Sequence, residues 1–568
     1  MENLAQRKKN SLDIRIAAAQ LAHDQNDPIR EHLANGDESL PKRMMSFTKG
    51  LPHDSHSGLL KDEADFEKFV KGICKGDPEV IKETPLGPPG NKWLSKKGKV
   101  ISKVRAWESA GAGLTFDLEG PDAQAVTMKP APALGSDELI AEMAEVYCQA
   151  ILRDIPFTQF NKHPLVGECL KALNHLAYFK EDRRNGQALN LANAFRGFTE
   201  GDLVGPYISQ FLLMGNNGLH RKGTNPEFAV SEGQINYGSI TIDQRVRVAK
   251  EKNYMVDWKE YIDVQNGADF RNLEEYVTDE RRFISTGRDL STYVHYDALY
   301  EAYLNACLLL LGAGAPFDDG IPFQEDDTKD KQQGFAHYGP PHILTLVTEV
   351  ATRALKAVRY QKFNVHRRLR PEALGARMHR FDAILSHLPD WTESAKLKKT
   401  FDDLEAAGIF DFFPKDNCLL PMAFCEGSPM HPSYGAGHAT VAGACVTILK
   451  AFFKHDAYLN IAKKGTTFSV GDKATTKRAF VPSKSGYSLE VIPSVPLTVE
   501  GELNKLAANI SIGRNWAGVH YYSDYTDSVL LGEEIAIGLL QEQALTYNPT
   551  ENFSLTLPKF DGTIITID

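Results

Sequence analysis

Two basic residues in the stretch "QKFNVHRRLRPEALGAR" could hold a negatively charged group. Lys362 and Arg370 stand eight residues apart, and a proline follows Arg370. Because a residue before proline avoids the α conformation, we expect a helix to end at Arg370 and its guanidinium to point sideways into a pocket. The alternative is a solvated basic face, since Arg367, Arg368 and Arg377 are close in sequence.

Two histidines lie on a glycine-rich loop in "MHPSYGAGHATVAGAC", residues 430–445. A proline and two glycines interrupt helical regularity before His438, and an apolar stripe of helical period follows it. We therefore expect His438 at or just before a helix N-terminus, where free N–H groups and the helix dipole favour an anion. Gly437 lacks a Cβ, so its N–H can approach an oxyanion closely. The alternative is a tight turn in which His438 is a capping or core histidine and His431 is structural.

The third segment, "NISIGRNWAGVHYYSDYTDSV", combines an arginine, a histidine and an aspartate. Gly513 is typical of a residue that stops a helix, which would leave Arg514 just outside it. A bend at Gly518 could bring Arg514 and His520 to one site. Asp524 follows His520 by one helical turn, a spacing that suits a carboxylate orienting an imidazole. The alternative is a capping aspartate beside a buried histidine.

Together these segments supply the groups that a phosphate-like oxyanion needs. Each close charge contact contributes on the order of a few kcal/mol at an effective dielectric constant near 20. Arginine adds paired, planar donors. The candidate set is Lys362, Arg370 and Arg514 with His438, His520 and the N–H of Gly437.

The elements that must position these groups are mainly helices. Apolar residues recur three and four apart in five stretches, which predicts a large helical bundle. Residues 100–130 and 465–500 contain short strand-like pieces broken by proline and glycine, which we interpret as small β-hairpins. We expect one domain over 1–568, with residues 1–130 as a wrapping arm. The five stretches are 295–314, 342–363, 440–455, 503–513 and 527–545.

Composition indicates an ordinary globular protein. The 568 residues are 42% hydrophobic and 24% charged, enough to bury a large core, and the net charge of -10 argues against nucleic-acid or anionic-membrane partners. The seven cysteines lack a CxxC spacing, so we do not expect a cysteine zinc site. No secretory signal is seen, and the most apolar stretch, 304–317, is too short to span a bilayer. The default expectation is a cytoplasmic protein.

The segments "K-x7-RP", "HPSYGAGHA" and "GRNWAGVHYYSD" resemble the signatures of the vanadium-dependent haloperoxidases, most of all the bromoperoxidases of red algae and cyanobacteria. The resemblance extends into flanks such as "IPFQEDDTKDKQQGF". It implies a vanadate cofactor that lets hydrogen peroxide oxidise bromide, iodide and, weakly, chloride to a hypohalous acid that halogenates small organic substrates. It also implies that His520 binds vanadium, while Lys362, Arg370, Arg514 and the N–H of Gly437 hold the equatorial oxygens.

The resemblance assigns roles to two further histidines. His438 would be the acid–base group beside the apical oxygen, and Lys362 would polarise the bound peroxide. His431 matches an additional histidine of the bromide-using branch. Ala436 departs from the family, which usually has serine there, so one hydroxyl donor to vanadate is lost.

A second metal site and an assembly are also expected. The loop "PFQEDDTKDKQ" offers carboxylates and carbonyl oxygens that suit calcium, although a solvated acidic turn is the alternative. Red algal relatives hold a structural calcium in such a loop and form dodecamers, so the resemblance implies calcium and a homododecamer built from dimers. The expected calcium ligands are Phe323, Glu325, Asp327, Asp330 and Gln332.

Two other functions fit the same residues. Acid and lipid phosphatases of the superfamily use an equivalent pocket, with His520 attacking phosphorus and His438 protonating the leaving group. A protein that binds an oxyanion without turnover is the third hypothesis. Chain length, His431 and the flanking similarity favour the peroxidase.

Overall fold

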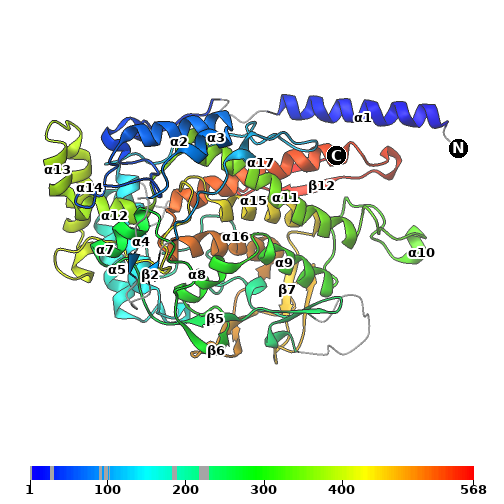
Figure 1. Ribbon diagram of the computed structural model, residues 1–568. Coiled ribbons are helices and arrows are strands. Elements are labelled where there is room, and N and C mark those ends of the chain that lie inside the picture. The colour runs from blue at the N-terminus through cyan, green and yellow to red at the C-terminus, as the bar shows by residue number, and fades with distance from the viewer. Residues whose placement is uncertain are drawn as a thin grey trace.

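Long helices pack side by side at the centre of the molecule (Figure 1). The computed structural model describes residues 3–25, 31–87, 93–94, 100–101, 103–181, 188–216 and 229–568. Helix α15 is almost fully buried and packs against α11, α16 and α17. The predicted mainly helical bundle is confirmed. The bounds of these central helices are α11 Pro340–Tyr360, α15 Gly437–Phe452, α16 Val499–Trp516 and α17 Tyr522–Ala544.

Two glycines allow α15 and α17 to touch through their backbones. A Cβ built on Gly443 of α15 would lie 2.0 Å from the carbonyl oxygen of Val529, and one on Gly532 of α17 would lie 2.0 Å from that of Thr440. Real side chains cannot approach a carbonyl so closely, so only glycine permits this helix distance. The contact fixes the start of α17 relative to the start of α15.

The remaining helices surround this core. Helix α8 packs on α16, and α9 packs on α11 and α15. The expected helix at 295–314 is divided, because α8 ends at Tyr296 and α9 begins at Glu301. Their bounds are α1 Leu4–Asp24, α2 Glu63–Lys75, α3 Pro78–Glu83, α4 Asp137–Leu152, α5 Pro164–His175, α6 Ala177–Glu181, α7 Trp258–Gln265, α8 Gly287–Tyr296, α9 Glu301–Gly312, α10 Asp327–Asp330, α12 Pro371–His379, α13 Phe381–His387 and α14 Ser394–Ala406.

The strands are short and antiparallel, and they form small sheets around the bundle. The hairpins expected at 465–500 are confirmed there. For residues 105–130 the prediction is wrong: a 3-10 turn at Gly111–Leu114 packs against the end of α11, where a Cβ on Gly113 would lie 2.5 Å from the Tyr360 nitrogen. The pairs are β1 Trp93–Leu94 with β2 Val100–Ile101, β3 Gln234–Tyr237 with β4 Ile240–Asp243, β5 Val246–Ala249 with β6 Tyr276–Arg282, β9 Arg478–Pro482 with β10 Leu489–Pro493, β12 Leu555–Pro558 with β13 Ile564–Ile567, and β7 Tyr458–Ile461 between β8 Phe468–Gly471 and β11 Leu497–Thr498.

One apolar core includes side chains from Leu40 to Ile567. The N-terminal region joins this core and a smaller cluster in which Phe66 and Phe69 of α2 pack with Phe363. Helix α1, by contrast, has no buried residue and lies along the outside of the molecule (Figure 1). All seven cysteines are free thiols. No helix among the described residues has the length and apolar character needed to cross a membrane.

Substitution of Gly532 tests the contact between α15 and α17. Gly532→Ala places a methyl group against the Thr440 carbonyl, so we expect a loss of about 1 to 3 kcal/mol in the free energy of unfolding and a lower apparent Tm. The matched control is Gly167→Ala in α5, where nothing lies within 4 Å of the added Cβ. Thermal unfolding followed by circular dichroism measures both variants, and equal Tm values would contradict the close approach.

Candidate active site

Lys362 and Arg370 lie on either side of an irregular turn after α11. The helix continues into a π-helical turn at Gln361–His366, and Arg367 then takes a left-handed conformation with φ of 43°. Arg370 is extended, as its proline neighbour predicts, but it precedes α12 and does not end a helix, because the π turn has already ended α11. The expected helix end at Arg370 is therefore wrong, whereas its exit from the α conformation is confirmed.

The alternative of a solvated basic face is also wrong, because Arg368 and Arg377 are buried and Arg367 is half-buried. Arg368 forms ion pairs with Glu142 and Asp524, both with N to O distances of 2.9 Å. Arg377 donates to the carbonyl oxygens of Gly58 and Met44. Arg368 and Arg377 are therefore engaged with partners in the protein interior, and they are not the cations that would bind an anion in the pocket.

The glycine-rich loop leads directly into α15, with Gly437 as the first helical residue and His438 as the second. The prediction of a helix N-terminus at His438 is confirmed. The Ala436 N–H donates to Ser528 Oγ at 2.8 Å. A Cβ on Gly437 would meet only the far ends of Leu355 and Arg359, at 3.8 and 4.0 Å, so the space in front of this residue is open.

His438 is paired with a carboxylate that sequence reasoning missed. Its Nε2 lies 3.0 Å from Oδ1 of Asp297, the C-cap residue directly after α8. Burial lowers the pKa of His438, with Arg514 and Lys362 adding to this, while Asp297 raises it. The imidazole is therefore neutral near pH 7. No sequence signal identifies Asp297, because its partner is 141 positions away.

Arg514 and His520 both line the pocket, but only part of the backbone conformation expected between them is observed. Helix α16 continues to Trp516, so the predicted helix end at Gly513 is wrong. Gly513 instead allows side chains of α8 to lie 3.1 Å from where its Cβ would be. The expected bend occurs at Gly518, whose φ is 88°, and it returns His520 to the cavity that Arg514 also lines.

His520 is held by the aspartate one turn later. Its Nδ1 lies 2.7 Å from Oδ2 of Asp524, and its Nε2 lies 3.0 Å from Nη1 of Arg370. Burial raises the pKa of Asp524, but Arg368 and His520 together lower it more, so Asp524 is ionised. Burial lowers the pKa of His520 well below its usual value, and Arg370 lowers it further. Nδ1–H therefore donates to Asp524, and the lone pair of Nε2 accepts a hydrogen bond from Nη1 of Arg370.

Three buried cations share this site without a carboxylate partner. Lys362 Nζ donates to the carbonyl oxygens of Pro432 and Ser433, at 2.8 and 3.0 Å. Arg370 donates to the carbonyl oxygens of His431 and Val519. Arg514 Nη1 donates to the Val294 carbonyl, while its Nε is buried and has no hydrogen-bond partner among the described residues.

The energetics of these cations favour a bound anion. Burial lowers the pKa of Lys362 well below its usual value, and Arg370 and Arg359 lower it further. Burial likewise lowers the pKa of Arg370 and of Arg514 to about 10. No ion pair joins any of the three to a carboxylate within the described ranges. A tetrahedral oxyanion between them would supply the missing negative charge, so the residues fit vanadate.

The cavity itself has a volume of about 470 Å³. One wall carries a pair that sequence reasoning missed: Arg359 donates a short hydrogen bond to Glu108, and Glu108 Oε1 lies 3.3 Å from Nε2 of His431. Arg359 precedes Lys362 by three residues, and residues with this spacing lie on the same face of a helix. The sequence could therefore have identified Arg359 as a candidate site residue. Glu108 belongs to the N-terminal region and carries no such signal. Lys362 and Arg370 are not among the residues that line the cavity. The cavity is lined by His431, Gly437, His438, Arg514 and His520 together with Arg105, Glu108, Arg271, Asn272, Val294, His295, Tyr296, Asp297, Leu299, Leu355, Arg359, Glu426 and Pro429.

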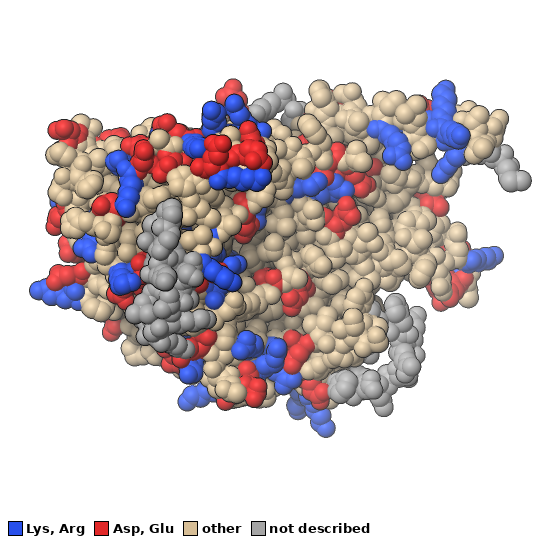
Figure 2. Space-filling view, in the orientation of Figure 1, with Lys and Arg blue, Asp and Glu red and all other residues tan. Residues whose placement is uncertain are grey.

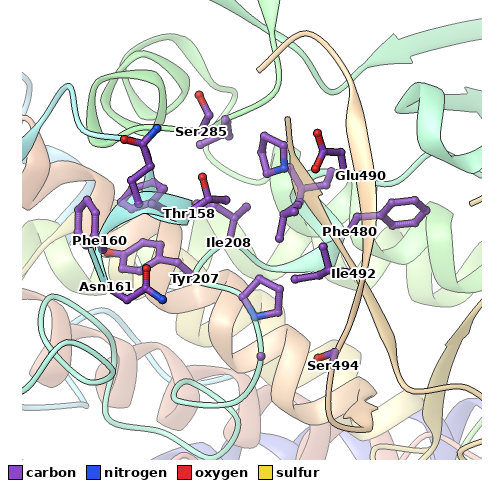
Figure 3. Close-up of a pocket in the computed structure, with 18 of the residues that line it drawn as sticks. Thr158, Phe160, Asn161, Tyr207, Ile208, Ser285, Phe480, Glu490, Ile492 and Ser494 are labelled. Carbon is purple, nitrogen blue, oxygen red and sulfur yellow. The ribbon is translucent and has the colours of Figure 1, made fainter. Parts of the chain in front are cut away.

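A larger hollow lies elsewhere. It has a volume of about 750 Å³ and is bordered by the segment around Thr158 and by β9 and β10 (Figure 3). Its lining is mostly apolar, with Phe160, Tyr207 and Ile492 among the side chains, and it contains none of the predicted site residues. Size therefore does not identify the candidate site; the converging charged groups do.

In the acidic loop around α10, the carboxylates of Asp327 and Asp330 accept hydrogen bonds from neighbouring residues of the same segment. Asp330 Oδ2 accepts from the Glu325 N–H at 2.8 Å, and Gln333 Nε2 donates to both carboxylate oxygens of Asp327 at 2.9 Å. Asp327 is exposed and Asp330 is partly buried. Both carboxylates thus accept hydrogen bonds from the protein, and the calcium site stays a prediction.

On the face drawn in Figure 2, Lys and Arg side chains alternate with Asp and Glu, and no broad basic face forms there. The buried positive charge is instead at the pocket. Arg514 lines the cavity, whereas Arg370 is buried behind the lining residues His431 and His520, and Lys362 is buried against the loop that follows His431. Fold and pocket together define the class: a helical bundle with a buried cationic pocket suited to a tetrahedral oxyanion.

Comparison with known proteins agrees with this class. Residues 417–547 match the family model described as VCPO second helical-bundle domain. The chain is 46% identical to the vanadium-dependent bromoperoxidases of Corallina pilulifera and Corallina officinalis, over 100% of this chain and 99% of each relative. It is 31% identical to that of Ascophyllum nodosum, over 97% of this chain and 90% of the relative. The chain belongs to the family of vanadium-dependent bromoperoxidases.

A solved structure agrees over the whole length. The homohexameric second vanadate-dependent bromoperoxidase (AnII) from Ascophyllum nodosum superposes with a TM-score of 0.76 at 26% identity. The match covers 100% of this chain and 91% of that chain. The helical fold of the family is therefore present throughout the chain.

Substitution of Asp524 tests the orientation of His520. In Asp524→Asn the imidazole loses its ionised partner, so we expect the dissociation constant for orthovanadate to rise about 10- to 100-fold. The control is Asp527→Asn, which alters a buried carboxylate on the same helix that accepts from Tyr434 and pairs with Lys129. Calorimetric titration measures both variants. If both variants bind orthovanadate equally weakly, the cause is a general disturbance of α17, and the orientation of His520 by Asp524 is contradicted.

Proposed function

We propose that this protein is a vanadate-dependent bromoperoxidase, in which hydrogen peroxide oxidises bromide to hypobromous acid that halogenates small organic substrates. The overall reaction joins H₂O₂, Br⁻ and H⁺ to give HOBr and H₂O. The observation that carries the proposal is the group of three buried, unpaired cations around His520, whose Nδ1–H is held by Asp524. Membership of the family supports the same activity.

The chain's own residues would hold the cofactor by charge and by one coordinating nitrogen. Lys362, Arg370 and Arg514 would neutralise the oxygens, with the N–H of Gly437 as a further donor, and Nε2 of His520 would bind vanadium. The chemistry supplied by bound vanadate is activation of peroxide at a V(V) centre that does not change oxidation state. Ala436 offers no hydroxyl here.

His438 is placed to move the proton that peroxide must lose. Because Nε2 donates to Asp297, Nδ1 is the atom left to accept a proton. Asp297 also fixes the ring orientation, so that the proton can be returned to the departing oxygen. With the cofactor bound, Lys362 would polarise the oxygen that bromide attacks, because a buried charge acts more strongly away from water.

Replacement of His438 tests the enzyme proposal. For His438→Ala we expect a loss of about 10²- to 10⁴-fold in kcat with vanadate still bound. The control is His337→Ala, since His337 is exposed and pairs with Glu551. The assay compares bromination by peroxide, with and without orthovanadate, against hydrolysis of a phosphate ester. Hydrolysis without vanadate-dependent bromination would identify a phosphatase that uses His520 as nucleophile, and vanadate binding without turnover would identify a binding protein.

The proposal extends to assembly. We infer that the chain folds as one domain with residues 1–130 as its arm and assembles into a homododecamer built from dimers; a solved relative is described as homohexameric. Helix α1 supports an oligomer, because Leu4, Leu12 and Ile16 expose 70%, 57% and 58% of their surface. Such exposed apolar side chains are typical of subunit contacts.

Helix α1 also provides the test of assembly. Replacement of Leu4, Leu12 and Ile16 by serine is expected to lower the mass measured by light scattering, because apolar contact area is lost. The control is the triple replacement of Lys8, Lys9 and Arg15 by glutamine on the same helix. A monomer for the unaltered chain would contradict the proposed assembly.

Three finer points remain part of the proposal. Calcium would bind at the loop of Asp327 and Asp330, after their present hydrogen bonds to Gln333 and Glu325 are released. Iodide, and weakly chloride, would be oxidised as bromide is. A cytoplasmic location also stays a prediction.

A further inference from the structure

Four potential metal ligands meet at the rim of the vanadate pocket. One ligand atom each from Glu274, His295 and Glu426 lies within 4.8 Å of the other two. His295 Nε2 is 2.8 Å from Oε1 of Glu426. The Sγ of Cys425 is 3.1 Å from Oε1 of Glu274 and 3.6 Å from Oε2 of Glu426. None of these residues has a role in the proposed reaction.

These residues come from three distant segments that the fold holds firmly. His295 lies near the end of α8 and stacks on the ring of Phe424, with ring centroids 3.7 Å apart and planes 13° apart. Cys425 and Glu426 follow that phenylalanine, and Glu274 stands two residues before β6. The cluster is therefore preorganised by neighbouring structure.

The cluster has more hydrogen-bond acceptors than donors. The thiol of Cys425 has one proton but three acceptors in reach, because the Phe270 carbonyl lies 2.7 Å from Sγ in addition to the two carboxylates. Oε2 of Glu274 is buried and has no hydrogen-bond partner among the described residues. Oε1 of Glu274 and Oε2 of Glu426 thus share one thiol as their donor within the cluster.

Two arginines lie near the cluster, and they donate hydrogen bonds to other groups. Arg105 Nη1 donates to the backbone carbonyl oxygens of Glu426 and Ser428, at 3.1 and 3.2 Å. Arg271 pairs with Asp269 at 2.8 Å. A cation between the carboxylates would satisfy the orphaned oxygen and replace the thiol proton.

We propose that Cys425, Glu426, Glu274 and His295 form a binding site for a divalent transition metal such as Zn²⁺ or Co²⁺. One sulfur, one imidazole nitrogen and two carboxylate oxygens are a donor set that these ions accept in tetrahedral geometry. Tetrahedral bonds of about 2.0 to 2.3 Å place neighbouring ligand atoms about 3.3 to 3.8 Å apart. Nε2 of His295 and Oε1 of Glu426, now 2.8 Å apart, would therefore separate slightly to admit the ion. Glu426 and His295 line the cavity, which gives the ion an entry path.

The site would fix the mouth of the pocket. His295 is two residues before Asp297, which contacts His438, so a metal would tie the end of α8 to the 425–426 loop and the chain before β6. The inference concerns metal binding alone and does not depend on the proposed peroxidase activity.

Cobalt titration of the full-length protein, first treated with EDTA, tests the site. We expect one Co²⁺ per chain, with a visible spectrum that includes a thiolate-to-cobalt charge-transfer band, both with and without orthovanadate. Cys425→Ser should lose that band, and Glu274→Gln should weaken the affinity at least about tenfold, as one of four ligands is lost. Cys74→Ser is the matched control, because Cys74 is exposed and remote from the cluster.

The outcomes separate the alternatives. Cobalt binding that disappears when orthovanadate is added would assign the ion to the histidines of the vanadate pocket and overturn the proposal. Unchanged affinity in Glu274→Gln, or no saturable binding by the wild type, would also overturn it and leave a proton shared between the carboxylates. If Cys425→Ser does not fold, the second readout is the apparent Tm: Zn²⁺ should raise it for the wild type and not for Glu274→Gln.

Discussion

The burial of positive charge without a direct carboxylate contact, among the described residues, is the constraint on which this structure depends. Lys362, Arg370 and Arg514 are kept out of water by the helices around them, and each donates only to neutral acceptors. Such an arrangement costs free energy in the empty protein. It becomes favourable when an oxyanion enters, because the attraction between opposite charges is strong in a poorly solvated site. The protein thus gives up stability to obtain affinity for the cofactor.

The buried charges behind His520 are paired with one another, in contrast to the three cations at the pocket. Arg368 contacts both Glu142 and Asp524, and Asp524 also accepts from the side chains of Ser433 and His520. This network holds one imidazole in one tautomer and places a negative charge behind it, away from the cavity. Negative charge lies behind His520 and positive charge faces the anion, so the field across the ring suits a metal-oxo anion at Nε2.

Helix packing sets these distances. Gly443 and Gly532 bring α15 and α17 into backbone contact, and the first turns of the same two helices carry His438 and Asp524. A small shift between the helices would therefore move His438, the proposed acid–base group, relative to Asp524, which orients the proposed vanadium ligand His520. The N-terminal region completes the cavity from outside with Glu108, which contacts both Arg359 and His431. The N-terminal region, remote in sequence from the other site residues, thus contributes a carboxylate to one wall of the cavity.

The sequence by itself determined those parts of the protein that depend on local conformation. Helical periodicity predicted the bundle, the proline after Arg370 predicted its extended backbone, and the spacing of His520 and Asp524 predicted their contact. The helix end at Gly513 was predicted wrongly, because this glycine serves the packing of α8 on α16, which no local pattern records. Only the tertiary structure decided the partners of the site, such as Asp297 and the cluster at the pocket rim, because those contacts join residues more than a hundred positions apart.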